Sequence, residues 1–265
     1  MIRNAEELTP DTKWKETVWS CAREEDLADS VSNPRLCVAV LLPFHHRKPD
    51  WRSFERMLVW MSDCAHHFGV EITYVLNADT GYVFNLSEEL YEEVIIRFRS
   101  LYPDASFISG VTAMGASPEN FEASCYHPHL DIAQNYQPSE VMIMTSQALN
   151  ALGSEKRRDA YFQIAENIKV SALVHALEPA FVPWATPFDP WLLHQLAGHE
   201  KFVGGKISTL DEPHFLYWAA MCRDLGLNFV PHSGDDFGIA SAIKMGLPLL
   251  IGAGVSACPL ICAAK

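Results

Sequence analysis

The chain has 265 residues, of which 49% are hydrophobic and 20% charged, and it contains no apolar run long enough to span a membrane. Its net charge of −13 opposes nonspecific binding to nucleic acid or to an anionic membrane surface. Seven scattered cysteines without a CxxC pair are typical of reduced thiols rather than of disulfides or a zinc site. The polar, acidic N-terminus lacks the apolar core of a signal peptide, so we expect a cytoplasmic protein.

Residues 1–36 are charged and weakly patterned, and we expect an N-terminal extension there with one helix around 10–27. From residue 37 to residue 265, short apolar runs alternate with amphipathic helical patterns. The apolar runs predict strands at 37–42, 71–76, 106–110, 141–145, 170–175, 202–206, 228–232 and 248–252. The patterns between them predict helices at 51–68, 87–101, 119–136, 155–168, 190–196, 212–225 and 236–245.

Strands that alternate with helices imply parallel βαβ units. Eight such strands fit a (β/α)8 TIM barrel better than a doubly wound sheet. No G-x-G-x-x-G follows the first strand, which argues against a dinucleotide-binding domain. An eighth helix would begin near Pro259, so we expect a barrel over 37–265 with a shortened C-terminus.

Lys206 stands in a run of apolar and glycine residues, Phe202-Val203-Gly204-Gly205-Lys206-Ile207-Ser208. Side chains alternate along a strand, so Gly204 shares the face of Lys206 and is expected to leave open space beneath the amine. A lysine in water is almost fully protonated at pH 7, and desolvation lowers its pKa enough to make the amine nucleophilic toward a carbonyl. The alternative is a strand-end lysine that reaches solvent.

In a (β/α)8 barrel the active site lies at the carboxyl ends of the strands, and Lys206 ends the sixth predicted strand. That position favours a chemical role for the amine. Asp79, Thr80 and Gly81 follow the second strand, where exposed backbone N–H groups and the threonine hydroxyl would cradle a substrate carboxylate. A plain turn is the alternative for this loop. The remaining candidates for substrate binding at this edge are Ser208, Gly234 and Asp235.

Four motifs resemble the dihydrodipicolinate synthase / N-acetylneuraminate lyase family, over roughly residues 37–265. Leu42-Pro43-Phe44 is similar to its Thr-Pro-Phe, and Asp79-Thr80-Gly81 lies where the family has Gly-Thr-Thr-Gly-Glu. Val203-Gly204-Gly205-Lys206-Ile207-Ser208 resembles its Val-Gly-Ile-Lys-Asp-Ser, and Ser233-Gly234-Asp235-Asp236 matches its closing pattern. The resemblance implies a barrel that binds a 2-oxo acid, usually pyruvate, as an imine on the lysine. Aldol cleavage, condensation or dehydration would follow.

The departures from the family concern acid–base groups. Tyr82 replaces the family's glutamate, and Asp79 replaces a threonine, where an acid would repel a substrate carboxylate unless it points away. The family's tyrosines after strands four and five have no clean equivalent. We predict that His175 serves as the proton shuttle, because an imidazole titrates near neutrality, with Glu178 as the second choice. A packed, hydrogen-bonded histidine at the strand end is the alternative for His175.

Two histidine pairs invite a metal interpretation: His45-His46 and the H-x-H of His127-Pro128-His129. The second pair lies in a predicted helix, and neither pair has a third ligand at a recognisable spacing. We therefore expect no metal and no cofactor.

The sequence predicts a divergent Schiff-base (class I) lyase on a small 2-oxo acid, and we expect the second substrate to be an aldehyde. Lys206 would attack the keto carbon, Thr80 and Gly81 would hold the carboxylate, and His175 or a bound water would move protons. One alternative is a family member that binds a ligand or partner without turnover, and another is a metal-dependent barrel hydrolase. The resemblance also suggests a homo-oligomer, and we expect neither nucleic acid nor membrane as a partner.

Overall fold

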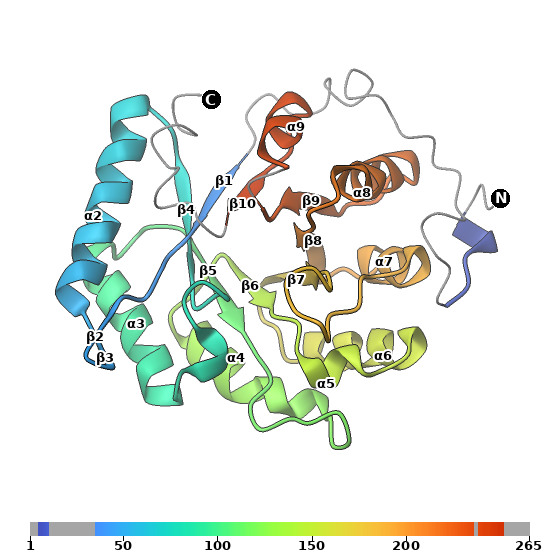
Figure 1. The fold of residues 1–265 in the computed structure, drawn as a ribbon, viewed down its shortest axis with the longest axis horizontal. Coiled ribbons are helices and arrows are strands. Elements are labelled where there is room, and N and C mark those ends of the chain that lie inside the picture. Colours follow the sequence, from blue (N-terminus) through green and yellow to red (C-terminus); the bar gives the residue numbers. More distant parts are fainter. Residues whose placement is uncertain (1–4, 11–34, 236–237, 252–265) are drawn as a thin grey trace.

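Eight parallel strands close into a barrel. The structure is a computed structural model that describes residues 5–10, 35–235 and 238–251. The strand order is β1-β10-β9-β8-β7-β6-β5-β4, and Figure 1 shows helices packed around the outside. The strands are β1 (Leu36–Ala39), β4 (Ile72–Leu76), β5 (Phe107–Val111), β6 (Glu140–Ile143), β7 (Ser171–Leu177), β8 (Phe202–Ser208), β9 (Val230–Ser233) and β10 (Leu249–Ile251). The predicted (β/α)8 barrel is confirmed.

The helices follow the predicted order. They are α2 (Trp51–Phe68), α3 (Glu88–Leu101), α4 (His127–Asn135), α5 (Gln147–Asn150), α6 (Ser154–Ala165), α7 (Pro190–Ala197), α8 (Glu212–Asp224) and α9 (Ile239–Lys244). Short 3-10 turns occupy η1 (Ala5–Glu7), η3 (Val83–Asn85) and η4 (Ala123–Tyr126). The predicted helices at 10–27 and after Pro259 lie outside the described residues. No helix in the part of the chain that the structure describes is long and apolar enough to cross a membrane.

Besides the ends of several strands, three local features differ from the prediction, and the first is the short helix α5, which no predicted helix covers. The helix expected at 119–136 is split into η4 and α4, because Pro128 fits the first turn of a helix but not its interior. The loop after β1 contains a two-stranded hairpin, β2 (Phe44–His45) with β3 (Lys48–Pro49), which is too short to leave a periodic signal.

Helix α2 illustrates how the sequence sets an element. Its buried residues recur at helical spacing: Phe54, Leu58, Met61 and Ala65. Asp50 caps the N-terminus by accepting from the Ser53 backbone N–H at 3.1 Å. Gly69 ends the helix at φ 67°, a left-handed conformation that glycine adopts without a steric penalty. Both predicted bounds of α2 therefore agree with the structure.

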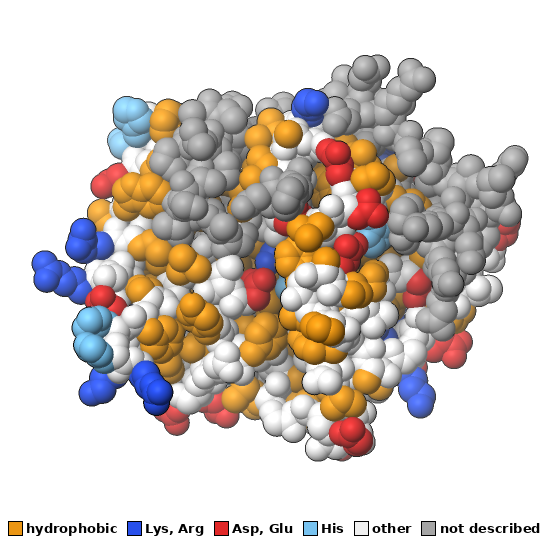
Figure 2. All heavy atoms as spheres, in the orientation of Figure 1, with side chains coloured by type: hydrophobic (Ala, Val, Ile, Leu, Met, Phe, Trp, Pro, Cys, Tyr) orange, Lys and Arg blue, Asp and Glu red, His pale blue; other side chains and the backbone are white. Residues whose placement is uncertain are grey.

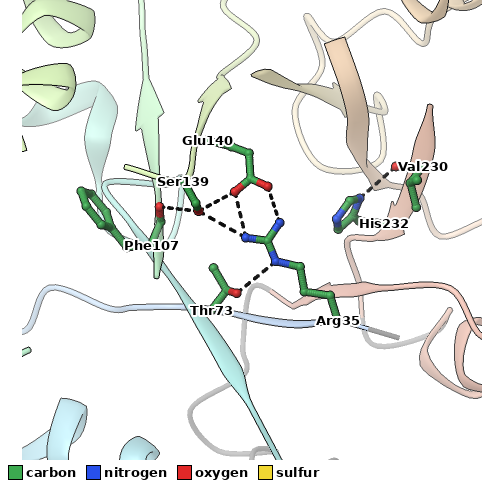
Figure 3. A network of polar contacts seen from close by, with 7 residues as sticks. All are labelled: Arg35, Thr73, Phe107, Ser139, Glu140, Val230 and His232. Atoms are coloured by element: carbon green, nitrogen blue, oxygen red, sulfur yellow. Dashed lines mark hydrogen bonds and ion pairs between the residues drawn. The ribbon is translucent and has the colours of Figure 1, made fainter. Parts of the chain in front are cut away.

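A polar network closes the amino ends of the strands (Figure 3). The Arg35 guanidinium donates to both carboxylate oxygens of Glu140, at 2.5 and 2.8 Å, and its Nε donates to Thr73 Oγ1 at 3.0 Å. Burial alone would raise the pKa of Glu140, but hydrogen bonds from Arg35 and Ser139 outweigh it and the pKa lies below its ordinary value. These contacts link the segments that begin β1, β4 and β6.

Replacing Arg35 by Met should reduce the free energy of unfolding by about 2 kcal/mol, because Glu140 is left partly buried without its bidentate partner. Urea denaturation of the two proteins measures the change. Arg56→Met on the exposed face of α2 is the matched control and should change stability by less than about 0.5 kcal/mol. Equal midpoints for Arg35→Met and the wild type would show that the network does not stabilise the barrel.

Candidate active site

Lys206 is buried in strand β8 and forms an ion pair with Asp79. Its side chain is 1% exposed, and Nζ lies 3.1 Å from each of the two carboxylate oxygens of Asp79. Asp79 lies in the loop after β4, 127 residues away in the sequence. The carboxylate thus points at the amine and not away from it. In this orientation it would repel the carboxylate of a substrate bound to the amine.

Burial opposes ionisation of Asp79, but the charges of Lys206 and His175 and the hydrogen bond from Lys206 outweigh it. The pKa of this carboxyl consequently lies well below its ordinary value. The site therefore holds a carboxylate at physiological pH, beside a basic group.

The backbone of the Asp79 loop is tightly folded. Asn77 and Tyr82 have φ of 52° and 60°, in the left-handed region that non-glycine residues rarely occupy. Across the loop, the Gly81 N–H donates to Ala78 O at 3.0 Å, and the Tyr82 N–H donates to Asp79 O at 3.0 Å. The exposed N–H of Gly81 predicted from the sequence is wrong, because this group already has a partner within the turn.

Thr80 contributes two different groups to the loop. Its backbone N–H lies next to the Asp79 carboxylate and helps to lower the pKa of that group. Its hydroxyl is buried without a hydrogen-bond partner. The hydroxyl is therefore the part of the predicted cradle whose hydrogen-bonding capacity is unused within the described residues.

His175 lies beside Lys206 in the parallel register of β7 and β8, and it is fully buried. Its Nε2 is 3.2 Å from Ser208 Oγ, and its buried Nδ1 has no partner. Burial and the charge of Lys206 lower its pKa to about 3, against the opposing effect of Asp79. The premise that this imidazole titrates near neutrality is wrong. A shuttle role for His175 stays a prediction, and the ring is neutral at physiological pH.

Gly234 and Asp235 bring the end of β9 against β8. A Cβ on Gly234 would lie 2.8 Å from Lys206 Cγ and 2.7 Å from Ile207 O, so only glycine fits beside the lysine stem. Asp235 accepts from the backbone N–H groups of Thr209 and Gly238, each at 3.2 Å. Both residues position the loops next to Lys206, and direct contact with substrate stays a prediction. Asp236 of the same motif lies outside the described residues.

The space beneath the amine is filled. A Cβ on Gly204 would lie 2.4 Å from Val230 O and 3.3 Å from His232 Cε1. The expected open space is therefore wrong, because the backbone of β9 and the His232 ring occupy it. This glycine lets the neighbouring strand approach, a contact that no local sequence pattern reveals.

Glu178, the second choice for the proton shuttle, pairs with a histidine of helix α8. Its carboxylate contacts His214 Nδ1, and His214 Nε2 accepts from Trp218 Nε1 at 3.1 Å. The acceptor role of Nε2 places the imidazole proton on Nδ1, facing the carboxylate. Glu178 thereby joins the end of β7 to helix α8, an engagement that the sequence did not indicate.

The two histidine pairs of the sequence lie in different elements, and neither forms a metal site among the described residues. His127 and His129 lie in α4 as expected, and the His129 ring stacks on Tyr91 with centroids 4.1 Å apart. His45 and His46 lie in and next to the β2–β3 hairpin, with ring centroids 4.1 Å apart. Among the described residues, no group of three or more His, Cys, Asp or Glu side chains is arranged to hold a metal.

Sequence comparisons find no relative: no family model matches the chain, and no curated protein matches it. Solved structures do match. The dihydrodipicolinate synthase of Bacteroides thetaiotaomicron aligns with a TM-score of 0.73 and 14% identity, covering 89% of this chain and 76% of that one. A monomeric dihydrodipicolinate synthase variant gives 0.72 and 16%, covering 86% and 72%. A prophage protein of the same family from E. coli K12, in complex with pyruvate, gives 0.71 and 12%, covering 86% and 72%.

The chain has the fold of the dihydrodipicolinate synthase proteins. At 12–16% identity the likeness concerns the fold alone. In this dihydrodipicolinate synthase fold, Lys206, His175 and Asp79 come together at one end of β7, β8 and β4. Sequence reasoning found all three residues but missed the ion pair that joins two of them.

Proposed function

We propose that this protein is a Schiff-base lyase in which Lys206 forms an imine with the carbonyl carbon of a small substrate. The observation that carries the proposal is a buried amine in β8, paired with a carboxylate, towards the end of a parallel barrel where such folds place their chemistry. A lysine withdrawn from water is the group that enzymes use for imine formation.

The reaction balances in charge. The Lys206 ammonium passes one proton to the carbonyl oxygen as Nζ attacks the carbonyl carbon, and Asp79 stays ionised beside the nitrogen. The carbonyl oxygen leaves as water, taking that proton and one further proton from nitrogen, and an iminium remains beside the Asp79 carboxylate. The iminium then accepts the electron pair of an adjacent breaking bond as an enamine, which protonation and hydrolysis return to amine and product. In this step His175 and Ser208 act only as neutral hydrogen-bonding groups.

Two carbonyl classes fit this chemistry. A 2-oxo acid such as pyruvate is predicted from the sequence motifs, and the pyruvate complex of the prophage protein with the same fold supports it. An aldehyde, predicted as the second substrate, is the other class.

We also propose a cytoplasmic homo-oligomer. The free thiols of Cys37, Cys64, Cys125 and Cys222 fit a reducing compartment. Phe44 and Tyr82 touch edge-on, with centroids 5.7 Å apart, and are 44% and 49% exposed in the loops after β1 and β4. Figure 2 shows hydrophobic side chains exposed between charged ones on one face of the molecule. Such side chains are available for a subunit contact.

Reduction with borohydride in the presence of carbonyl compounds tests the imine. We expect a mass gain equal to the reduced substrate, located on Lys206 by peptide mapping. Lys206→Arg should remove the adduct, because a guanidinium keeps the charge beside Asp79 but does not form an imine. Lys169→Met, at an exposed lysine, is the matched control and should keep the adduct.

A barrel that binds a ligand without turnover is the second candidate. The observation in its favour is that Lys206 and Asp79 already satisfy each other, as a purely structural ion pair would. This candidate predicts no adduct on Lys206 with any 2-oxo acid, aldehyde or ketone in protein whose circular dichroism shows a folded barrel. That outcome would reject the lyase proposal.

A further inference from the structure

We propose that the carbonyl substrate attached to Lys206 carries no carboxylate, and that it is a small uncharged aldehyde or ketone. The inference rests on the proposed function and narrows its substrate class. Its basis is that the carboxylate of Asp79 already occupies the anion position beside the amine, with both oxygens 3.1 Å from Nζ.

A 2-oxo acid would bring a second carboxylate to the same place. Its carboxylate carbon is bonded directly to the carbon that Nζ attacks, so its oxygens necessarily lie within a few ångströms of the amine. Asp79 holds its own oxygens at hydrogen-bond distance from that amine. Two carboxylates in such a site repel, and at roughly 5–6 Å in protein surroundings the repulsion corresponds to about a hundredfold in affinity.

The negative charge of Asp79 is already balanced by Lys206 without a substrate anion. Lys206 is the ion-pair partner of this carboxylate, and the buried imidazole of His175 beside it is neutral at physiological pH. One cation therefore faces one anion. Attachment of an uncharged carbonyl keeps that balance, because the ammonium becomes an iminium, whereas a 2-oxo acid adds an unmatched negative charge.

Most backbone donors of the loop after β4 are already engaged. The N–H groups of Gly81, Tyr82 and Val83 all donate within the turn. The Thr80 hydroxyl is buried and has no partner. A single hydroxyl suits the oxygen of a neutral carbonyl or of an adjacent hydroxyl, whereas a carboxylate seeks several donors.

Pyruvate and pyruvamide make a matched pair of probes, since they differ in charge but hardly in shape. The experiment reduces the full-length protein with borohydride at increasing concentrations of each probe and quantifies the Lys206 adduct by peptide mass. Nα-acetyl-lysine amide, treated in parallel, gives the intrinsic reactivity ratio of the two probes. After that correction, pyruvamide should reach half-maximal trapping at about a hundredfold lower concentration than pyruvate.

Asp79→Asn removes the charge and keeps the shape, so the preference for pyruvamide should fall to within about threefold of the intrinsic ratio. Asp104→Asn, at an exposed aspartate, should keep the full preference. Equal trapping of both probes by the wild type would overturn the inference and leave the lyase proposal standing. Absence of any adduct, including with glycolaldehyde and hydroxyacetone, would reject the lyase proposal and the inference with it.

Discussion

Lowering the pH from 7 to 5 should reduce the free energy of unfolding by about 5 kcal/mol, because three buried histidines are kept neutral by the fold. Burial lowers the pKa of His129 and His232 to about 4, and burial with the charge of Lys206 lowers that of His175 to about 3. An unfolded histidine titrates near 6.5. Each depressed pKa therefore contributes stability that is present above about pH 6.5 and is lost as the pH falls toward the folded value, about 2 kcal/mol per histidine by pH 5.

Asp79 does not contribute in this window. Its pKa is also lowered, but an unfolded aspartate titrates near 3.9, so its stabilisation is lost only below about pH 4. Urea denaturation at pH 7, 6 and 5 measures the loss directly. The slope of unfolding free energy against pH gives the number of protons taken up on unfolding.

Single substitutions show how much each histidine contributes to the loss of unfolding free energy between pH 7 and pH 5. His129→Leu removes a ring whose two nitrogens have no partner, so the loss between pH 7 and 5 should shrink by about one third. His67→Gln, at an exposed histidine of α2, is the matched control and should leave the loss unchanged. A free energy of unfolding that is the same at pH 5 and pH 7 would contradict the neutral state of these rings in the folded protein.

The barrel could be predicted from the sequence because its signal is local. Each strand is a short apolar run, and each helix repeats its buried residues every three or four positions, as the exact agreement of α2 with 51–68 illustrates. Strand ends are less local. β7 and β8 each extend two residues beyond the predicted 175 and 206, because Ile207 and Ser208 pair with Ala176 and Leu177 across the sheet.

The two extra residues in each strand explain why the side chains of Lys206 and His175 are buried. His175 and Lys206 each lie two residues before the end of their strand, and those two further residues help to exclude water from them. The sequence could place both side chains at the mouth but could not show how deeply they are buried. The pKa of His175 and the contact with Asp79 both depend on that depth.

The ion pair lay beyond the reach of sequence reasoning for another reason. Asp79 and Lys206 are separated by 127 residues, and no periodicity links the loop after β4 to strand β8. The sequence indicates only that an acid at position 79 would repel a substrate carboxylate unless its side chain points away. Its orientation depends on the backbone of one loop, in which Asn77 and Tyr82 adopt left-handed conformations.

Gly110→Ala tests whether that loop backbone positions Asp79, and it should reduce the free energy of unfolding by about 3 kcal/mol. Gly110 lies in β5, and an added Cβ would be 2.1 Å from Asn77 O and 2.9 Å from Asn77 C. Both are backbone atoms of the residue that begins the loop, so the overlap can be relieved only by moving the loop. We expect the Lys206 adduct to fall at least tenfold at a fixed carbonyl concentration.

Gly153→Ala is the matched control for this substitution. Nothing lies within 4 Å of a Cβ added at Gly153, and its φ of −67° is open to any residue. Because Gly153 is the N-cap of α6, alanine there should cost no more than about 1 kcal/mol of stability, and imine trapping should stay at the wild-type level. If Gly110→Ala instead kept wild-type stability and trapping, the loop would have to tolerate a shift of its first residue. The pairing of Asp79 with Lys206 would then be set by the attraction between the two charges and not by the backbone that carries the carboxylate.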